Sequence, residues 1–250
     1  MTLIRHSDPP FIFLKTRKTA GSSVEAYLLD YLDTDDEVPT STDPEPLDRP
    51  FWSTPNVTTG WTTLERSVKT RARKLNVHRM RLREHMDAQR VKRHVGAQAW
   101  ARYFKFCIER DPVDRFLSLW RWYNRKNGTA VSLEWMLATL ESGDSELIKA
   151  RGLHHWTNWS IYTIDHELAV DRVIRYERLH EELPEVLSRL GIPWNGDLPY
   201  YKVTQGGGSQ EKQVSESQQT RIRELYRNEL DLLYGQGPDS TRGRDASNHE

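Results

Sequence analysis

Residues 11 to 24 read Phe11-Ile-Phe-Leu-Lys-Thr-Arg-Lys-Thr-Ala-Gly-Ser-Ser-Val24, and this stretch predicts a strand, a loop and a helix in succession. The run from Phe11 to Leu14 is short and apolar, as in a buried strand. From Ser22 to Leu32 the apolar residues recur at helical spacing. The polar loop between them, Lys15 to Gly21, therefore ends at the start of a helix.

The start of a helix is a favourable place for an anion, because unpaired backbone N–H groups and the positive end of the helix dipole meet there. Lys18 adds an ammonium group, and Thr19, Ser22 and Ser23 add three hydroxyls. The stretch therefore predicts a phosphate or sulfate site. The ordinary alternative is a Lys and a Ser that do no more than cap the helix.

The loop does not follow the Walker A pattern of ATP and GTP sites, which needs Gly, four residues and then Gly-Lys-Ser/Thr, because here Lys18 precedes Gly21. Lys-Thr-Ala-Gly-Ser-Ser, residues 18 to 23, instead resembles the phosphosulfate loop of sulfotransferases, with Arg17 where Pro is common. These enzymes take sulfate from 3'-phosphoadenosine 5'-phosphosulfate (PAPS) and release adenosine 3',5'-bisphosphate (PAP). The resemblance implies that Lys18 acts in catalysis and that the whole loop binds the cofactor: Arg17, Lys18, Thr19, Ala20, Gly21, Ser22 and Ser23.

A second strand is predicted where Phe104, Phe106 and Ile108 alternate with other residues, and it leads into another helix. Asp111 is a natural N-cap for that helix, and Pro112 suits its first position. The segment from Arg110 to Ser118 resembles the sulfotransferase motif for the 3'-phosphate, which implies that Arg110 and Ser118 bind it. Read alone, this segment is an ordinary capped helix start; paired with the Lys18 loop upstream, it is specific.

A catalytic base is predicted within Glu84-His-Met-Asp-Ala88, which resembles the His-x-x-Ala stretch of many sulfotransferases. The acceptor hydroxyl must lose a proton as it attacks sulfur, and a neutral imidazole suits that task near pH 7. His85 is the first candidate. His94, Glu84 and Asp87 stay open as alternatives, as does a surface histidine without a role in catalysis.

Two segments are read from their charge. Residues 33–60 are expected to form a surface excursion, in which the acidic cluster of Asp33, Asp35, Asp36 and Glu37 is either solvated or helps to shape an acceptor pocket. Residues 69–94 are strongly basic, so they form either a solvated helix face or a surface for a polyanion.

The second half of the chain offers weaker signals. A strand over 169–177 and helices over 133–140, 146–150, 179–190 and 215–233 are predicted. Residues 154–159 form an aromatic and polar cluster in which acceptor contact or packing is expected rather than a metal, since no third ligand stands at helical spacing. Lys202, in a Gly-rich loop, is a further candidate for the 3'-phosphate. Residues 236–250 are expected to be a disordered tail.

Length and composition favour one α/β domain over residues 1–235, with three layers and a mostly parallel central sheet flanked by helices. The 36 Lys and Arg balance the 36 Asp and Glu, so no overall field favours nucleic acid or a membrane as partner. The single cysteine, Cys107, is expected to be a buried thiol. The absence of a long apolar run leads us to expect a cytoplasmic protein.

The sequence therefore predicts a metal-independent sulfotransferase that uses PAPS and acts on a hydroxyl of a carbohydrate or small-molecule alcohol. A small-molecule kinase using ATP and Mg²⁺, and a non-catalytic polyanion-binding module built on residues 69–94, are the alternatives. A homo-oligomer stays open.

Overall fold

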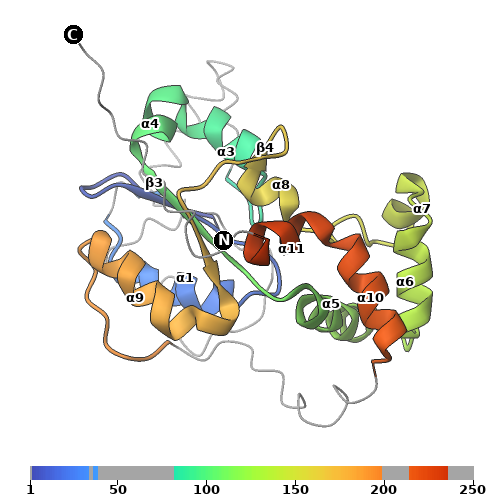
Figure 1. Cartoon of the computed structure of the whole chain (residues 1–250). Helices are drawn as coiled ribbons and strands as arrows, with labels where there is room; N and C mark the ends of the chain where they lie inside the picture. Colours follow the sequence, from blue (N-terminus) through green and yellow to red (C-terminus); the bar gives the residue numbers. More distant parts are fainter. Residues whose placement is uncertain (1, 34–35, 39–81, 199–213, 236–250) are drawn as a thin grey trace. The chain divides into compact units, whose positions relative to one another are not determined.

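The computed structural model describes residues 2–33, 36–38, 82–198 and 214–235. The chain divides into two compact units, one of Met1–Asp111 with His155–Gln213 and the other of Pro112–His154 with Val214–Glu250 (Figure 1). The predicted roles of Lys202, the Gly-rich loop and the tail, most of residues 33–60 and the first half of residues 69–94 fall outside the described residues.

The first unit contains the sheet. Its elements are β1 (Leu3–Arg5), β2 (Phe11–Leu14), α1 (Gly21–Leu29), α3 (Ala88–Val95), α4 (Ala97–Arg102), β3 (Phe104–Glu109), α8 (Trp159–Tyr162), β4 (Thr163–Ile164), β5 (Glu167–Leu168), β6 (Arg172–Arg175), the 3-10 turn η2 (Tyr176–Arg178) and α9 (Leu179–Arg189). The four-stranded sheet has the order β1-β2-β3-β6, in which β1 is antiparallel to β2 and the other pairs are parallel. Strands β4 and β5 form a separate antiparallel hairpin.

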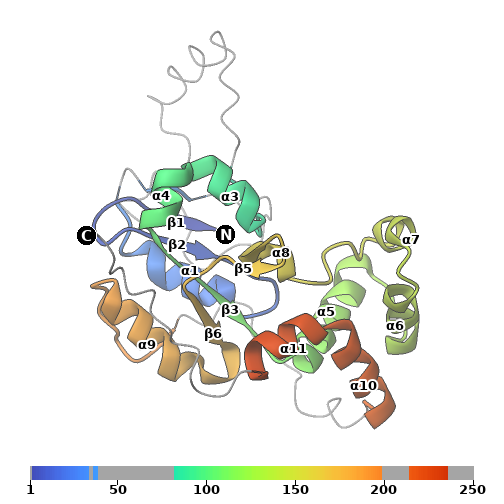
Figure 2. The ribbon, with the colours of Figure 1, turned by 45° about the horizontal axis from the view of Figure 1, so that its top comes forward.

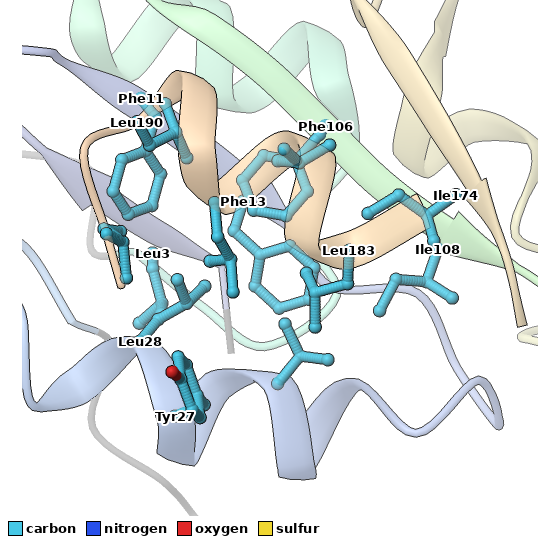
Figure 3. Close-up of a cluster of buried hydrophobic side chains, with 14 of the residues drawn as sticks. Leu3, Phe11, Phe13, Tyr27, Leu28, Phe106, Ile108, Ile174, Leu183 and Leu190 are labelled. Carbon is cyan, nitrogen blue, oxygen red and sulfur yellow. The ribbon is translucent and has the colours of Figure 1, made fainter. Parts of the chain in front are cut away.

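Helices cover both faces of this sheet, as predicted: α1 and α9 lie on one side, and α3 and α4 on the other (Figures 1 and 2). The strands can therefore be apolar throughout, and all four residues of β2 are fully buried. Figure 3 shows the core between the sheet and the pair α1 and α9. It is formed by side chains from the sheet and from the helix layer of α1 and α9, including Phe11, Phe13, Tyr27, Leu28, Phe106, Ile108, Ile174, Leu183 and Leu190.

The parallel strands bring three chain segments to one edge of the sheet. Leu14 pairs with Cys107, and Glu109 pairs with Arg175, so β2, β3 and β6 all end on the same side. In open α/β sheets, ligands bind beyond the carboxyl ends of the strands. This edge carries the loop before α1, Arg110 and the residues after β6.

The second unit is helical and consists of α5 (Pro112–Asn127), α6 (Leu133–Glu141), α7 (Ser145–Ala150), α10 (Glu216–Leu225) and α11 (Arg227–Tyr234). The single helix predicted over 215–233 is wrong, because the chain breaks at Tyr226, where φ is −112° and ψ is 29°. The fully buried ring of Tyr226 packs edge-on against Phe116 and lies 4.4 Å below the Arg115 guanidinium. These tertiary contacts with α5 coincide with the break.

The acidic cluster after α1 differs from the expected solvated loop. Asp36 is only 4% exposed, and its carboxylate accepts hydrogen bonds from the backbone N–H groups of His6 (2.6 Å) and Asp33 (2.7 Å). Glu37 pairs with Ile4 of β1 through backbone hydrogen bonds. Residues 36–38 are therefore attached to β1, the outermost strand of the sheet.

Two further findings concern the single cysteine and the search for helices that could cross a membrane. Cys107 is a buried free thiol, as predicted, and burial raises its pKa well above the ordinary value. Within the described ranges, no helix combines the length and the apolar character that crossing a bilayer requires.

Candidate functional site

The loop between β2 and α1 is held by buried hydroxyls. The Thr16 hydroxyl donates to the backbone oxygen of Ile108 on β3 and lies 2.7 Å from the Thr19 hydroxyl. Both threonines are about 1% exposed. The Thr19 hydroxyl, predicted to bind the cofactor, is thus turned into the loop and contacts Thr16, whose hydroxyl fastens the loop to the sheet.

The loop backbone adopts an unusual conformation at two residues. Lys18 and Ala20 are both left-handed, with φ of 66° and 59°. The left-handed conformation costs any residue other than glycine on the order of 1 kcal/mol or more, so the surrounding contacts must hold the loop in place. Left-handed residues in a turn can direct neighbouring N–H groups to one side, which suits the binding of an anion.

The first turn of α1 starts without a side-chain cap. Its N-cap residue is Ala20, whose side chain cannot accept a hydrogen bond, while Ser23 and Val24 bond back to the Ala20 oxygen. An anion at this point would take the place of the missing cap. The anion site predicted over residues 17–23 includes this helix start and stays a prediction.

Gly21 has a packing role. A Cβ atom at this position would lie 2.7 Å from Cγ of Lys15. Lys15 is buried and its ammonium group is 2.7 Å from the Glu25 carboxylate and 3.9 Å from Glu84. The absence of a side chain at Gly21 therefore leaves room for Lys15, which forms a buried ion pair with Glu25.

His85 lies against the same loop, although it is far away in the sequence. Its Nδ1 is 2.9 Å from the backbone oxygen of Lys15. A carbonyl accepts, so Nδ1 carries the hydrogen and Nε2 is left with the lone pair. Burial, and then the nearby Arg17 guanidinium, lower the His85 pKa to about 2, so the imidazole is neutral near pH 7.

The three other candidate bases are engaged in other contacts. Nε2 of His94 is 2.6 Å from the Glu37 carboxylate, and the Glu84 carboxylate is the one 3.9 Å from Lys15. The Asp87 carboxylate accepts a hydrogen bond of 2.8 Å from Ser160. Among these residues, it is His85 that contacts the loop with a ring nitrogen.

Arg110, the predicted 3'-phosphate ligand, directly follows β3. Its guanidinium carbon is 4.5 Å from the ring centre of Tyr176, which follows β6. Its backbone N–H donates to the Glu109 carboxylate at 3.0 Å. Ser118 lies on α5, in the second unit, and is half-buried.

Two residues at the site were not among the predicted site residues: Asn158 and Glu109. The side-chain amide of Asn158 binds both backbone groups of Arg17, and it also donates to the Glu109 carboxylate. Asn158 falls inside the aromatic and polar cluster noted in the sequence. No spacing rule connects it with Arg17, because the two are 141 residues apart.

The fold and the loop define an α/β protein with a P-loop-like strand, loop and helix. The model of the Sulfotransferase family matches residues 1–235, and the chain belongs to this family. Over 116 residues, 45% of this chain and 88% of the relative, it is 24% identical to an uncharacterized protein of Archaeoglobus fulgidus. No solved structure matches the chain.

Proposed function

We propose that the protein transfers the sulfuryl group of PAPS to a hydroxyl of a carbohydrate or small-molecule alcohol. The observation that carries the proposal is the placement of two motifs at the ends of neighbouring parallel strands. The Lys18 loop follows β2, and Arg110 follows β3. Family membership supports sulfotransfer as the reaction class.

The residues at this edge fit a nucleotide with two anionic ends. The left-handed turn, the uncapped start of α1 and the Lys18 ammonium suit the 5'-phosphosulfate. The Arg110 guanidinium suits the 3'-phosphate, since its planar fork can form two parallel hydrogen bonds. Ser118 and Lys202 remain proposed partners of that phosphate on the sequence resemblance.

In the proposed reaction, PAPS supplies an activated sulfuryl group. An acceptor oxygen forms a bond to sulfur while the bond from sulfur to the 5'-phosphate oxygen breaks. Lys18 and the loop N–H groups stabilise the negative charge that grows on the leaving oxygen, which is the kind of contribution that usually dominates such catalysis. The proton of the acceptor hydroxyl passes to His85.

His85 is suited to receive this proton at Nε2, because its Nδ1 hydrogen is held by the Lys15 oxygen. Its low pKa makes it a weak base in the free protein. An anion bound beside Arg17 would offset the positive charge that, after burial, lowers the His85 pKa, and it would raise the basicity of the ring. The residue therefore becomes a better base when the donor is bound.

The test is calorimetric binding of PAP, 5'-ADP and 5'-AMP without metal, on the wild type and on Arg110→Ala. We expect PAP to bind at least tenfold more tightly than ADP, and the substitution to remove this preference, because a charged bidentate contact is worth about 1.5–3 kcal/mol. Arg102→Ala, at the end of α4, is the matched control and should leave the preference unchanged.

An absence of any preference for PAP would overturn the proposal. Binding of ATP that requires Mg²⁺ would favour the kinase instead. Binding that falls steeply with salt and ignores the 3'-phosphate would favour a polyanion-binding module.

A further inference from the structure

Asn158, the residue before α8, is fully buried and makes an unusual set of contacts. Its Oδ1 accepts from the Arg17 N–H at 2.9 Å, and its Nδ2 donates to the Arg17 oxygen at 3.1 Å. The side-chain amide thus pairs with Arg17 as a neighbouring strand would. The two peptide planes on either side of Arg17 are both fixed.

The second of these planes matters for the loop. A trans peptide points its C=O and its N–H in opposite directions. The plane that carries the Arg17 oxygen also carries the Lys18 N–H. With the oxygen held by Asn158, the Lys18 N–H is turned away from Asn158, at the residue where the backbone becomes left-handed.

The same amide reaches the other half of the site. Asn158 Nδ2 lies 3.2 Å and 3.4 Å from the two oxygens of Glu109, which is fully buried at the end of β3. Glu109 in turn accepts from the Arg110 N–H at 3.0 Å. A continuous chain of hydrogen bonds therefore runs from Arg17 through Asn158 and Glu109 to Arg110.

We propose that Asn158 is a positioning residue that, with Glu109, fixes the spacing between the Lys18 loop and Arg110, so that the site selects nucleotides bearing both a 3'- and a 5'-anion. This inference rests on the proposed function. When the two anion sites are held at the right separation, a ligand bound at one meets the other at little further entropic cost. We call this chain of hydrogen bonds through Asn158 and Glu109 the bridge. Without it, binding of the second phosphate must also fix the position of the residues that contact it.

The test compares the affinity for PAP with that for 5'-AMP in Asn158→Ala and in Asn124→Ala. Asn124, on α5 in the second unit, forms the same pair of bonds with Val131: it accepts from the N–H at 2.8 Å and donates to the oxygen at 3.1 Å. Both variants lose two backbone contacts and should show lowered melting temperatures. Calorimetry is done well below both transitions.

We expect Asn158→Ala to lower the PAP preference about tenfold, since residues in one hydrogen-bonded network couple at that scale. Asn124→Ala should leave the preference unchanged. Asn158→Ser introduces no second carboxylate beside the buried Glu109, but its short hydroxyl cannot bond to Arg17 and Glu109 at once, and it should also lose the preference. This variant tests the bridge if Asn158→Ala fails to fold.

The inference and the proposed function fail differently. If the wild type prefers PAP and Arg110→Ala removes the preference, while both Asn158 variants keep it within about twofold, the function stands and the positioning role falls. If the wild type shows no preference, the proposed function falls as well. An equal loss of PAP and AMP affinity in the Asn158 variants would mean that Asn158 supports the loop alone, which also overturns the bridge.

Discussion

The two units each contain a loop that an asparagine holds in the same way. Asn158 binds the N–H and the oxygen of Arg17, three residues before the N-cap of α1. Asn124 binds the N–H and the oxygen of Val131, one residue before the N-cap of α6. In both places a side-chain amide replaces a missing backbone partner just before a helix.

The helices that follow start differently. The N-cap of α6 is Ser132, in an ordinary extended conformation, and its hydroxyl accepts from the Trp135 N–H at 3.1 Å. The N-cap of α1 is Ala20, in a left-handed conformation and without an accepting side chain. At the start of α6, a side chain of the protein caps the backbone N–H groups. At the start of α1, an anion could take that role. The left-handed N-cap close to Lys18, rather than the asparagine contact that both loops share, distinguishes the start of α1.

The largest expected effect comes from removing the positive charge of Lys18, which lies just before the start of α1. Lys18→Ala should lower kcat by on the order of a hundredfold or more, because it removes positive charge placed where the leaving group becomes negative. The measurement is transfer of labelled sulfate from PAPS to an acceptor found by screening, with the melting temperature as a check on folding. Lys149→Ala, on the exposed side of α7, is the control and should leave kcat unchanged.

A Lys18→Ala variant that retains activity within about threefold of the wild type, against the hundredfold expected for a lost transition-state contact, would contradict the role of the loop.

A smaller effect concerns pH, since His85 contacts the first loop. Its folded-state pKa, lowered to about 2 by burial and by Arg17, lies below the unfolded value of about 6.5. The stability that the neutral ring contributes is therefore fully present above pH 6.5 and is lost as the pH falls from there toward 2. Stability should drop by up to about 1.4 kcal/mol per pH unit in this window.

Urea unfolding at pH 7, 6 and 5 measures this slope. His85→Gln should reduce it, whereas His180→Gln, at an exposed position on α9, should not. Equal slopes in His85→Gln and the wild type would mean that the histidine is not held neutral by the loop.

Much of the fold follows from local patterns in the sequence. The strand from Phe11 to Leu14 and the strand from Phe104 were predicted because their apolar residues are continuous or alternate. The three-residue strand β1 was not predicted, since so short a run carries no period, and it exists by pairing with β2. The break at Tyr226 was missed because burial against α5, not helical spacing, accompanies it.

The candidate site divides in the same way. Lys18, Gly21 and Arg110 could be proposed from the sequence because they belong to continuous motifs, and their roles stay predictions. The placement of His85 against the Lys15 oxygen and the Asn158 bridge depend on how distant segments pack, which one sequence does not encode in its spacing. The left-handed backbone at Ala20 was also beyond sequence reasoning, because alanine rarely adopts it.

The most direct test of the central claim is the amide NMR spectrum of the labelled protein as PAP is added. We expect the N–H signals of Gly21 and Ser22 to shift downfield as they donate to the ligand, while those of Leu133 and Glu134, which follow the Ser132 cap, stay in place. If PAP binds and the Gly21 and Ser22 signals do not move, the start of α1 is not the anion site and the account is contradicted.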